Sequence, residues 1–247
     1  MVLRILAALL ALIVISPARA ESSVYIEEMT WPEVAASIKA GRNTAIIYTG
    51  STEQNGPQMV TGKHNFIAHS LAGTIARELG NALVYPVLPF APTGDPARLS
   101  GHMRFPGSVS LREDVYGAVV LDEALSAIAA GFRYVLIMGD HGGGQEQLAS
   151  VAKKLDSGAK PYGIRVYYIG SVYSRMAGGH AGREDTSMLM AIDPEGKWVR
   201  KDRIGEAGSG NGADSSPQGA SAEEGRRLIR DRVNAALQQI HAVIPAH

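Results

Sequence analysis

Three polar clusters in the sequence contain residue types that bind divalent transition metals. The first cluster contains Glu53 and His64, the second His141 and the third Asp185. Two imidazoles with one or two carboxylates suit zinc, manganese or iron and leave room for a water molecule on the ion. Such an ion activates water and polarises a carbonyl group, which is the chemistry that amide hydrolysis needs. The spacing alone is not diagnostic, because each ligand would come from a separate loop and there is no His-Glu-x-x-His pattern.

Each of these residues also has an ordinary structural explanation. Glu53 could be a turn carboxylate after a strand, and Asp185 could cap a helix. His64 could be an exposed loop histidine, and His141 could hydrogen bond to backbone beside the glycines that follow it. Residue types alone leave both explanations open.

Other catalytic chemistries lack their usual patterns. The glycines after His141 could expose backbone N–H groups to a phosphate, but the run 141–144 fits neither G-x-G-x-x-G nor the Walker pattern. The chain has no cysteine and no G-x-S-x-G segment. The sequence therefore disfavours a nucleotide site and a cysteine or serine nucleophile.

The elements that must position these clusters alternate between apolar β-branched runs and longer amphipathic stretches. This pattern is typical of a single α/β domain with a central, mostly parallel sheet flanked by helices. We predict strands over Thr44–Tyr48, Leu83–Leu88, Tyr134–Met138 and Val166–Ile169, and helices over Trp31–Lys39, Phe66–Leu79, Glu113–Ala130, Gln145–Leu155 and Ala222–Val243.

The polar clusters follow the predicted strands, and this placement is the main argument for a site. Ligands of open α/β sheets bind outside the carboxyl ends of the strands, so the three clusters should converge on one crevice. The stretch 205–219 is rich in glycine, serine and asparagine and should be a loop. It either lines this crevice or is simply mobile.

The first twenty residues are predicted to be a cleaved signal peptide, which leaves residues 21–247 as one domain in the periplasm or outside the cell. Arg4 precedes an apolar run too short to span a bilayer, and Ser16–Ala20 supplies small residues for cleavage. The formal net charge is 0, and loss of Arg4 and Arg19 would make it −2. This balance gives no electrostatic reason to expect nucleic acid or membrane lipid as a partner.

Taken together, the clusters resemble motifs of the creatininase family of metal-dependent amidohydrolases, from about residue 46 to about residue 225. Gly50–Pro57 is similar to the family's G-S-x-E-Q-H-G-P, and Phe105–Leu111 is similar to F-P-G-T-x-S-L. Gly131–Gly143 resembles G-F, six residues and N-G-H-G-G, and His180–Ser187 resembles H-A-G-x-x-E-T-S. The resemblance implies a creatininase-like fold, often assembled into homo-oligomeric hexamers, and a site that holds two metals.

Carried over by position, the resemblance places one metal on Glu53, His64 and His141. The second metal would have Asn55, His64 and Gly143, and this set departs from the family. His64 stands where the family has a bridging aspartate, and a neutral imidazole has one free lone pair and can ligate only one ion. Asn55 is a weak ligand, and Gly143 has no side chain. We therefore predict one divalent ion, zinc, with manganese or iron as alternatives. The other alternative is a decayed site that binds no metal.

The resemblance also assigns roles around the ion. His180 is expected to act as a general acid that protonates a leaving nitrogen. Asp185 replaces a glutamate of the motif and is the second predicted catalytic residue. Asn55, Asp140 and Arg183 are expected to contact the ligands or the substrate. Lys63 and Arg183 could bind an anionic substrate or could be surface charges.

The predicted function is hydrolysis of a C–N bond, in an amide or cyclic amide of a small molecule, through a water activated by the ion. Two alternatives stay open. One is a non-catalytic protein that binds a small ligand on the same fold, and the other is hydrolysis of a lactone or cyclic ketone.

Overall fold

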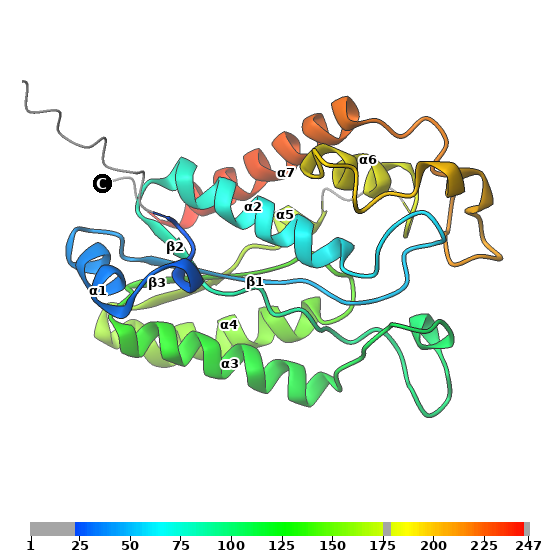
Figure 1. Ribbon diagram of the computed structural model, residues 1–247. Helices are drawn as coiled ribbons and strands as arrows, with labels where there is room; N and C mark the ends of the chain where they lie inside the picture. Colours follow the sequence, from blue (N-terminus) through cyan, green and yellow to red (C-terminus); the bar gives the residue numbers. More distant parts are fainter. Residues whose placement is uncertain (1–22, 175–178, 245–247) are drawn as a thin grey trace, which may run out of the picture.

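The computed structural model describes residues 23–174 and 179–244, so the predicted signal peptide lies outside the described residues. Within them the sheet has four parallel strands in the order β2-β1-β3-β4. The strands are β1 (Thr44–Thr49), β2 (Ala82–Val84), β3 (Tyr134–Gly139) and β4 (Arg165–Tyr168). The predicted α/β fold with a central parallel sheet is confirmed (Figure 1).

Helices cover both faces of the sheet. The α-helices are α1 (Trp31–Lys39), α2 (Lys63–Leu79), α3 (Glu113–Ala130), α4 (Gln145–Ala159), α5 (Ser171–Ser174), α6 (Arg183–Ile192) and α7 (Ala222–Val243). Short 3-10 helices span Ile26–Glu28, Gly101–Arg104, Lys160–Tyr162 and Lys201–Glu206. Helices α2, α5 and α7 lie on one face, and α3 and α4 lie on the other (Figure 1).

The alternation of side chains along β1 explains why this strand reads as a continuous apolar run. Ile46 and Tyr48 pack into the core beneath α2 and α7, whereas Ala45 and Ile47 pack into the core beneath α3 and α4. Successive side chains of a strand point to opposite faces, so a sheet covered twice needs apolar residues at every position. Side chains of β1 pack into a core on each face of the sheet, and both cores fix the register of the strand.

Several element boundaries differ from the sequence-based expectation, and α4, for example, extends to Ala159 rather than Leu155. β2 ends at Val84 rather than Leu88, and Pro86 supplies a physical reason because it has no N–H for the ladder. Helix α2 begins three residues earlier than predicted, at Lys63, so His64 lies in its first turn and not in a loop. The helix α6 was not predicted, although Asp185 was considered as a helix-capping residue; it lies inside the first turn.

The strand ends and the long connections place the polar clusters at one edge of the sheet. β1 and β3 end side by side at Thr49 and Gly139, which are partners in the register. Asp140 follows directly, and its N–H donates to the Thr49 carbonyl at 2.9 Å. Within the described residues, no helix has the length and apolar character needed to cross a membrane.

Candidate metal centre

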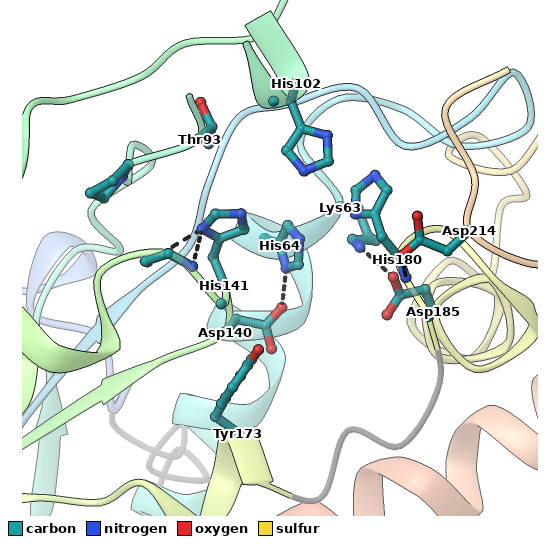
Figure 2. Close-up of a pocket in the computed structure, with 15 residues that line it drawn as sticks. Lys63, His64, Thr93, His102, Asp140, His141, Tyr173, His180, Asp185 and Asp214 are labelled. Carbon is teal, nitrogen blue, oxygen red and sulfur yellow. Dashed lines mark hydrogen bonds and ion pairs between the residues drawn. The ribbon is translucent and has the colours of Figure 1, made fainter. Parts of the chain in front are cut away.

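The carboxyl edge of the sheet opens into a cavity of about 480 Å³ (Figure 2). All three predicted clusters contribute to its lining, as expected from the strand order. Two further segments, around Thr93 and His102 and at Asp214, also line it. Asp214 belongs to the predicted loop 205–219, so this loop does line the cavity.

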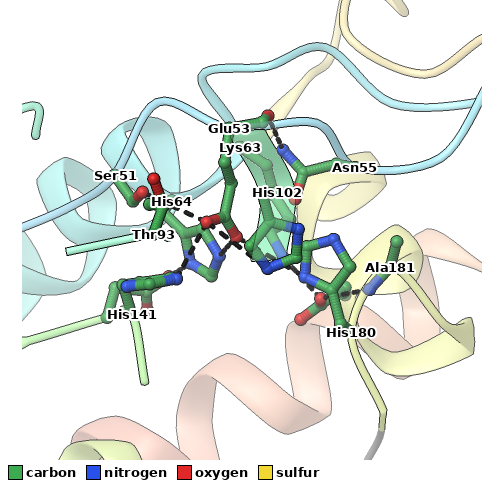
Figure 3. Close-up of polar contacts among 12 residues, drawn as sticks. Ser51, Glu53, Asn55, Lys63, His64, Thr93, His102, His141, His180 and Ala181 are labelled. Carbon is green, nitrogen blue, oxygen red and sulfur yellow. Dashed lines mark hydrogen bonds and ion pairs between the residues drawn. The ribbon is translucent and has the colours of Figure 1, made fainter. Parts of the chain in front are cut away.

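Glu53 lies at the centre of the cluster, and its carboxylate is fully buried (Figure 3). Four imidazoles surround it, two near each oxygen. Oε1 lies 3.0 Å from Nε2 of His64 and 3.5 Å from Nδ1 of His180. Oε2 lies 2.8 Å from Nε2 of His141 and 3.8 Å from Nε2 of His102. The predicted ligands Glu53, His64 and His141 therefore meet, but the two histidines face different oxygens.

His102 is a site residue that the sequence analysis did not identify. It lies in the 3-10 helix Gly101–Arg104, just before the F-P-G motif, outside the three polar clusters. The side-chain amide nitrogen of Gln54 lies between two rings, 2.9 Å from Nδ1 of His102 and 3.1 Å from Nε2 of His180. The only signal in the sequence was a histidine close to a family motif.

A buried ion pair holds His64. Nδ1 of His64 lies 2.7 Å from Oδ2 of Asp140, whose Oδ1 accepts a 2.6 Å hydrogen bond from Arg232. Both Asp140 and Arg232 are buried, and Arg232 also donates to the carbonyl of Val172 at 2.9 Å. Asp140 therefore orients a predicted ligand, and Arg232 in α7 compensates its charge.

A second buried ion pair joins Lys63 and Asp185, 2.5 Å apart. Lys63 is not a surface charge, because its side chain is fully buried and lines the cavity. Asp185 also accepts from the backbone N–H of Ala181 at 3.0 Å, and Ala181 has φ 56° although it is not glycine. A buried non-glycine residue in this region is strained, so its surroundings must hold the segment that carries His180.

Asn55 and Arg183, which were expected to contact the ligands or the substrate, lie in different surroundings. Asn55 is buried, and its amide donates to the Glu53 carbonyl at 2.9 Å, which fixes the turn that carries Glu53. Arg183 is half exposed, donates to Glu224 at 2.7 Å and is not part of the cavity lining.

The glycines after His141 allow a close approach of two segments. A Cβ atom at Gly143 would lie 2.0 Å from the Pro92 carbonyl oxygen and 3.0 Å from Cε1 of His141. Gly143 is therefore required by packing. The resemblance assigned Gly143 to the second metal, and this position has no space for a side chain here.

Burial and neighbouring charges shift the pKa values of the cluster in different directions. Burial would raise the pKa of Glu53, but His141 and His64 outweigh it and hold this pKa well below its usual range. Burial lowers the pKa of His180 to about 4 and also lowers the pKa of His102. His64 is the exception, because Asp140 and Glu53 raise its pKa despite its burial. At neutral pH His102 and His180 are neutral, and each has a lone pair on one nitrogen.

The fold and the ring of imidazoles around a carboxylate define the class of protein: an α/β protein with a metal-site donor set at the carboxyl edge of its sheet. Residues 27–240 match the model of the creatininase family, described as creatinine amidohydrolase. This match covers most of the chain, and the protein belongs to the creatininase family.

Individual relatives agree with this assignment. The chain is similar to the mycofactocin precursor peptide peptidase of Mycolicibacterium smegmatis, with 28% identity over 222 residues, 79% of this chain and 83% of the relative. Its fold is similar to a crystal structure of creatinine amidohydrolase, with a TM-score of 0.77, 22% identity and coverage of 92% of this chain and 100% of the other. A creatininase structure designated Mn gives a TM-score of 0.77 at 21% identity, with coverage of 91% and 100%.

Proposed function

We propose that this protein is a metal-dependent hydrolase that cleaves a C–N bond in a small amide or a short peptide. The observation that carries the proposal is the buried carboxylate of Glu53, which four imidazole nitrogens approach within 3.8 Å. In the described part of the chain, no lysine or arginine contacts this carboxylate. A buried carboxylate whose neighbours are imidazoles and not permanent cations is costly, and a bound divalent ion would compensate it.

The residues fit such an ion. Carboxylate and imidazole ligands suit zinc, manganese and iron. Two ligand atoms on a tetrahedral zinc, each about 2.1 Å from the ion, lie roughly 3.4 Å apart. The nitrogen–oxygen separations around Glu53 run from 2.8 to 3.8 Å and bracket this value. Glu53 and His64, with a further imidazole of the cluster, would hold the ion.

When bound, the ion would supply Lewis-acid activation of a substrate carbonyl and of water. Side chains of the protein orient the ligands and line the cavity in which the substrate would bind. Asp140 fixes the ring of His64, and Lys63, which is paired with Asp185, also lines the cavity. The rings of His102 and His180 also line the cavity, where a proton for the leaving nitrogen would be needed. The cavity volume suits a small molecule or the end of a peptide.

A peptide bond as the substrate is supported by the similarity to a peptide peptidase, whose name specifies the mycofactocin precursor peptide. An amide of a small molecule is supported by the family description, creatinine amidohydrolase. The N-terminal segment supports action in the periplasm or outside the cell, and assembly into a homo-oligomer is carried over from the family as part of the proposal.

The test combines metal analysis with turnover on the full chain. Zinc, manganese and iron are offered separately, bound metal is measured by elemental analysis, and a panel of acylated amides and short peptides is assayed for amine release. We expect bound metal, and a Glu53→Gln variant should lose metal and turnover together. Glu223→Gln, an exposed residue at the start of α7, is the matched control. Less than about a tenth of an equivalent of metal in the wild type would refute the proposal, because the chemistry needs a bound ion.

A further inference from the structure

The two oxygens of Glu53 differ in what the surrounding imidazoles present to them. Each neutral imidazole has one N–H and one lone pair, and the partner of one nitrogen decides which the other presents. The proton positions can therefore be assigned from the hydrogen-bond partners on the outer side of each ring.

His64 presents a lone pair to Oε1. Its Nδ1 faces Oδ2 of Asp140 at 2.7 Å, and the ion pair with Arg232 keeps this carboxylate an acceptor. Nδ1 must therefore carry the hydrogen. The lone pair of the neutral ring is then on Nε2, which lies 3.0 Å from Oε1 of Glu53.

His180 presents a second lone pair to the same oxygen. Its Nε2 lies 2.9 Å from the backbone carbonyl of Gln54 and 3.1 Å from the side-chain amide nitrogen of the same residue. The carbonyl can only accept and is the nearer partner, and the amide nitrogen donates to His102, so Nε2 carries the hydrogen. The lone pair is then on Nδ1, 3.5 Å from Oε1. The segment is held in this position, since the His180 N–H donates to Asp214 at 3.0 Å and the strained Ala181 is tied to Asp185.

Oε2 faces hydrogen-bond donors instead. The Gln54 amide is oriented by the Gly56 N–H, which donates to its oxygen at 3.0 Å, so the amide nitrogen donates to Nδ1 of His102 at 2.9 Å. The hydrogen of His102 is then on Nε2, which faces Oε2. The hydroxyl of Ser51 also donates to Oε2, at 3.4 Å.

His141 is the fourth ring and another donor to Oε2. Its Nδ1 accepts from the Gly143 N–H at 3.1 Å, a shorter contact than the 3.3 Å to the Gly143 carbonyl. The hydrogen is therefore on Nε2, which donates to Oε2 at 2.8 Å.

We infer that the divalent ion binds against Oε1 and that its protein ligands are Glu53 Oε1, His64 Nε2 and His180 Nδ1. His141 then donates a hydrogen bond to Oε2, and the N–H of His102 faces the same oxygen at 3.8 Å. Two lone pairs and an anionic oxygen repel one another unless a cation lies between them. A proton could bridge only one nitrogen–oxygen pair, whereas a metal ion satisfies all three atoms. Glu53, His64 and His180 each offer one ligand atom, and these atoms lie within 4.8 Å of one another. Glu53, His102 and His141 meet the same distance, but there N–H groups and not lone pairs face the carboxylate.

This inference rests on the proposed function, because it assumes that a divalent ion binds. It replaces His141 of the predicted ligand set with His180, the predicted general acid. Asp140 is then the carboxylate that orients the metal-binding imidazole of His64, through the ring nitrogen that does not bind the ion.

The test compares the metal affinity of single variants of the full chain. Zinc affinity is measured by isothermal titration calorimetry, and the visible spectrum of the cobalt-substituted protein reports the ligands directly. We expect His180→Ala to lower zinc affinity by more than about 100-fold and to change the cobalt spectrum. His141→Gln should stay within the roughly 10–100-fold loss typical of residues that hydrogen bond to a ligand, with the cobalt spectrum retained.

Two controls keep the comparison interpretable. Added imidazole should restore the cobalt spectrum of His180→Ala, which separates a lost ligand from a damaged fold. His69→Ala, a half-exposed histidine of α2 stacked on Tyr25, should leave zinc affinity unchanged. Loss of the metal in His141→Gln with retention in His180→Ala would overturn the inference but leave the proposed function standing. A wild type that binds no metal would overturn both.

Discussion

Replacing Arg232 with methionine should destabilise the protein strongly, because it leaves a buried carboxylate without its cation. Arg232 and Asp140 are 2% and 0% exposed, and the guanidinium donates to Asp140 at 2.6 Å and to the Val172 carbonyl at 2.9 Å. Methionine fills a similar volume, so the main effect is the lost charge and hydrogen bonds. Removing one partner of a buried ion pair costs about 3–5 kcal/mol. For a domain of this size, that corresponds to a melting temperature lower by roughly 6–20 °C.

The assay is urea unfolding followed by circular dichroism, in the presence of EDTA so that metal binding does not contribute. Arg227→Met is the matched control on the same helix, because Arg227 forms an exposed pair with Asp231 at 3.0 Å. Such a pair contributes only about 0.3–0.5 kcal/mol. The double variant Arg232→Met with Asp140→Asn should recover part of the loss, because no buried charge is left unpaired. A cost for Arg232→Met within about 1 kcal/mol of the Arg227→Met cost would refute this reasoning.

Two further predictions concern residues outside the ion pair. Burial raises the pKa of Glu123 to about 7, above its value in the unfolded chain, so stability should fall as pH rises through 7. Glu123→Gln should therefore be more stable than the wild type by on the order of 1 kcal/mol at about pH 8.5 and show no advantage at about pH 5. The free energy of unfolding is measured with urea at both pH values. The same difference between variant and wild type at both would contradict this prediction. Gly143→Ala should lose about 1–3 kcal/mol, because its Cβ would lie 2.0 Å from the Pro92 oxygen. Gly158→Ala in α4, with nothing within 4 Å, should gain about 0.5–1 kcal/mol, and equal thermal shifts in these two variants would contradict the packing argument.

Most of the fold could be predicted from the sequence because the sheet is buried on both faces. β1 and β3 are short apolar runs followed by glycine, and each polar cluster follows a strand end. The rule that parallel strands share a carboxyl edge then brought Glu53 and His141 to one place. The start of α2 was missed because Gly62, its N-cap residue, gives no side-chain capping signal.

The parts of the site that could not be predicted depend on contacts between distant segments. Arg232 lies 92 residues from Asp140 in the chain, and the sequence does not show which carboxylate it pairs with. His102 has no partner close in sequence, because Gln54 lies 48 residues away. The proton positions of the four rings, which decide which oxygen of Glu53 faces a cation, follow only from such contacts.

The position of Arg232 in the last helix sets the order in which the site can be assembled. Asp140, and through it His64, lacks its compensating charge until α7 packs against the sheet. During synthesis, this helix leaves the ribosome after the other described elements of the site, so the proposed metal centre cannot mature before α7 has been made. Under the export proposed above, the chain would then acquire its ion only after it has folded in the destination compartment. We expect a chain truncated before Ala222 to capture no metal, although it retains Glu53 and all four surrounding histidines.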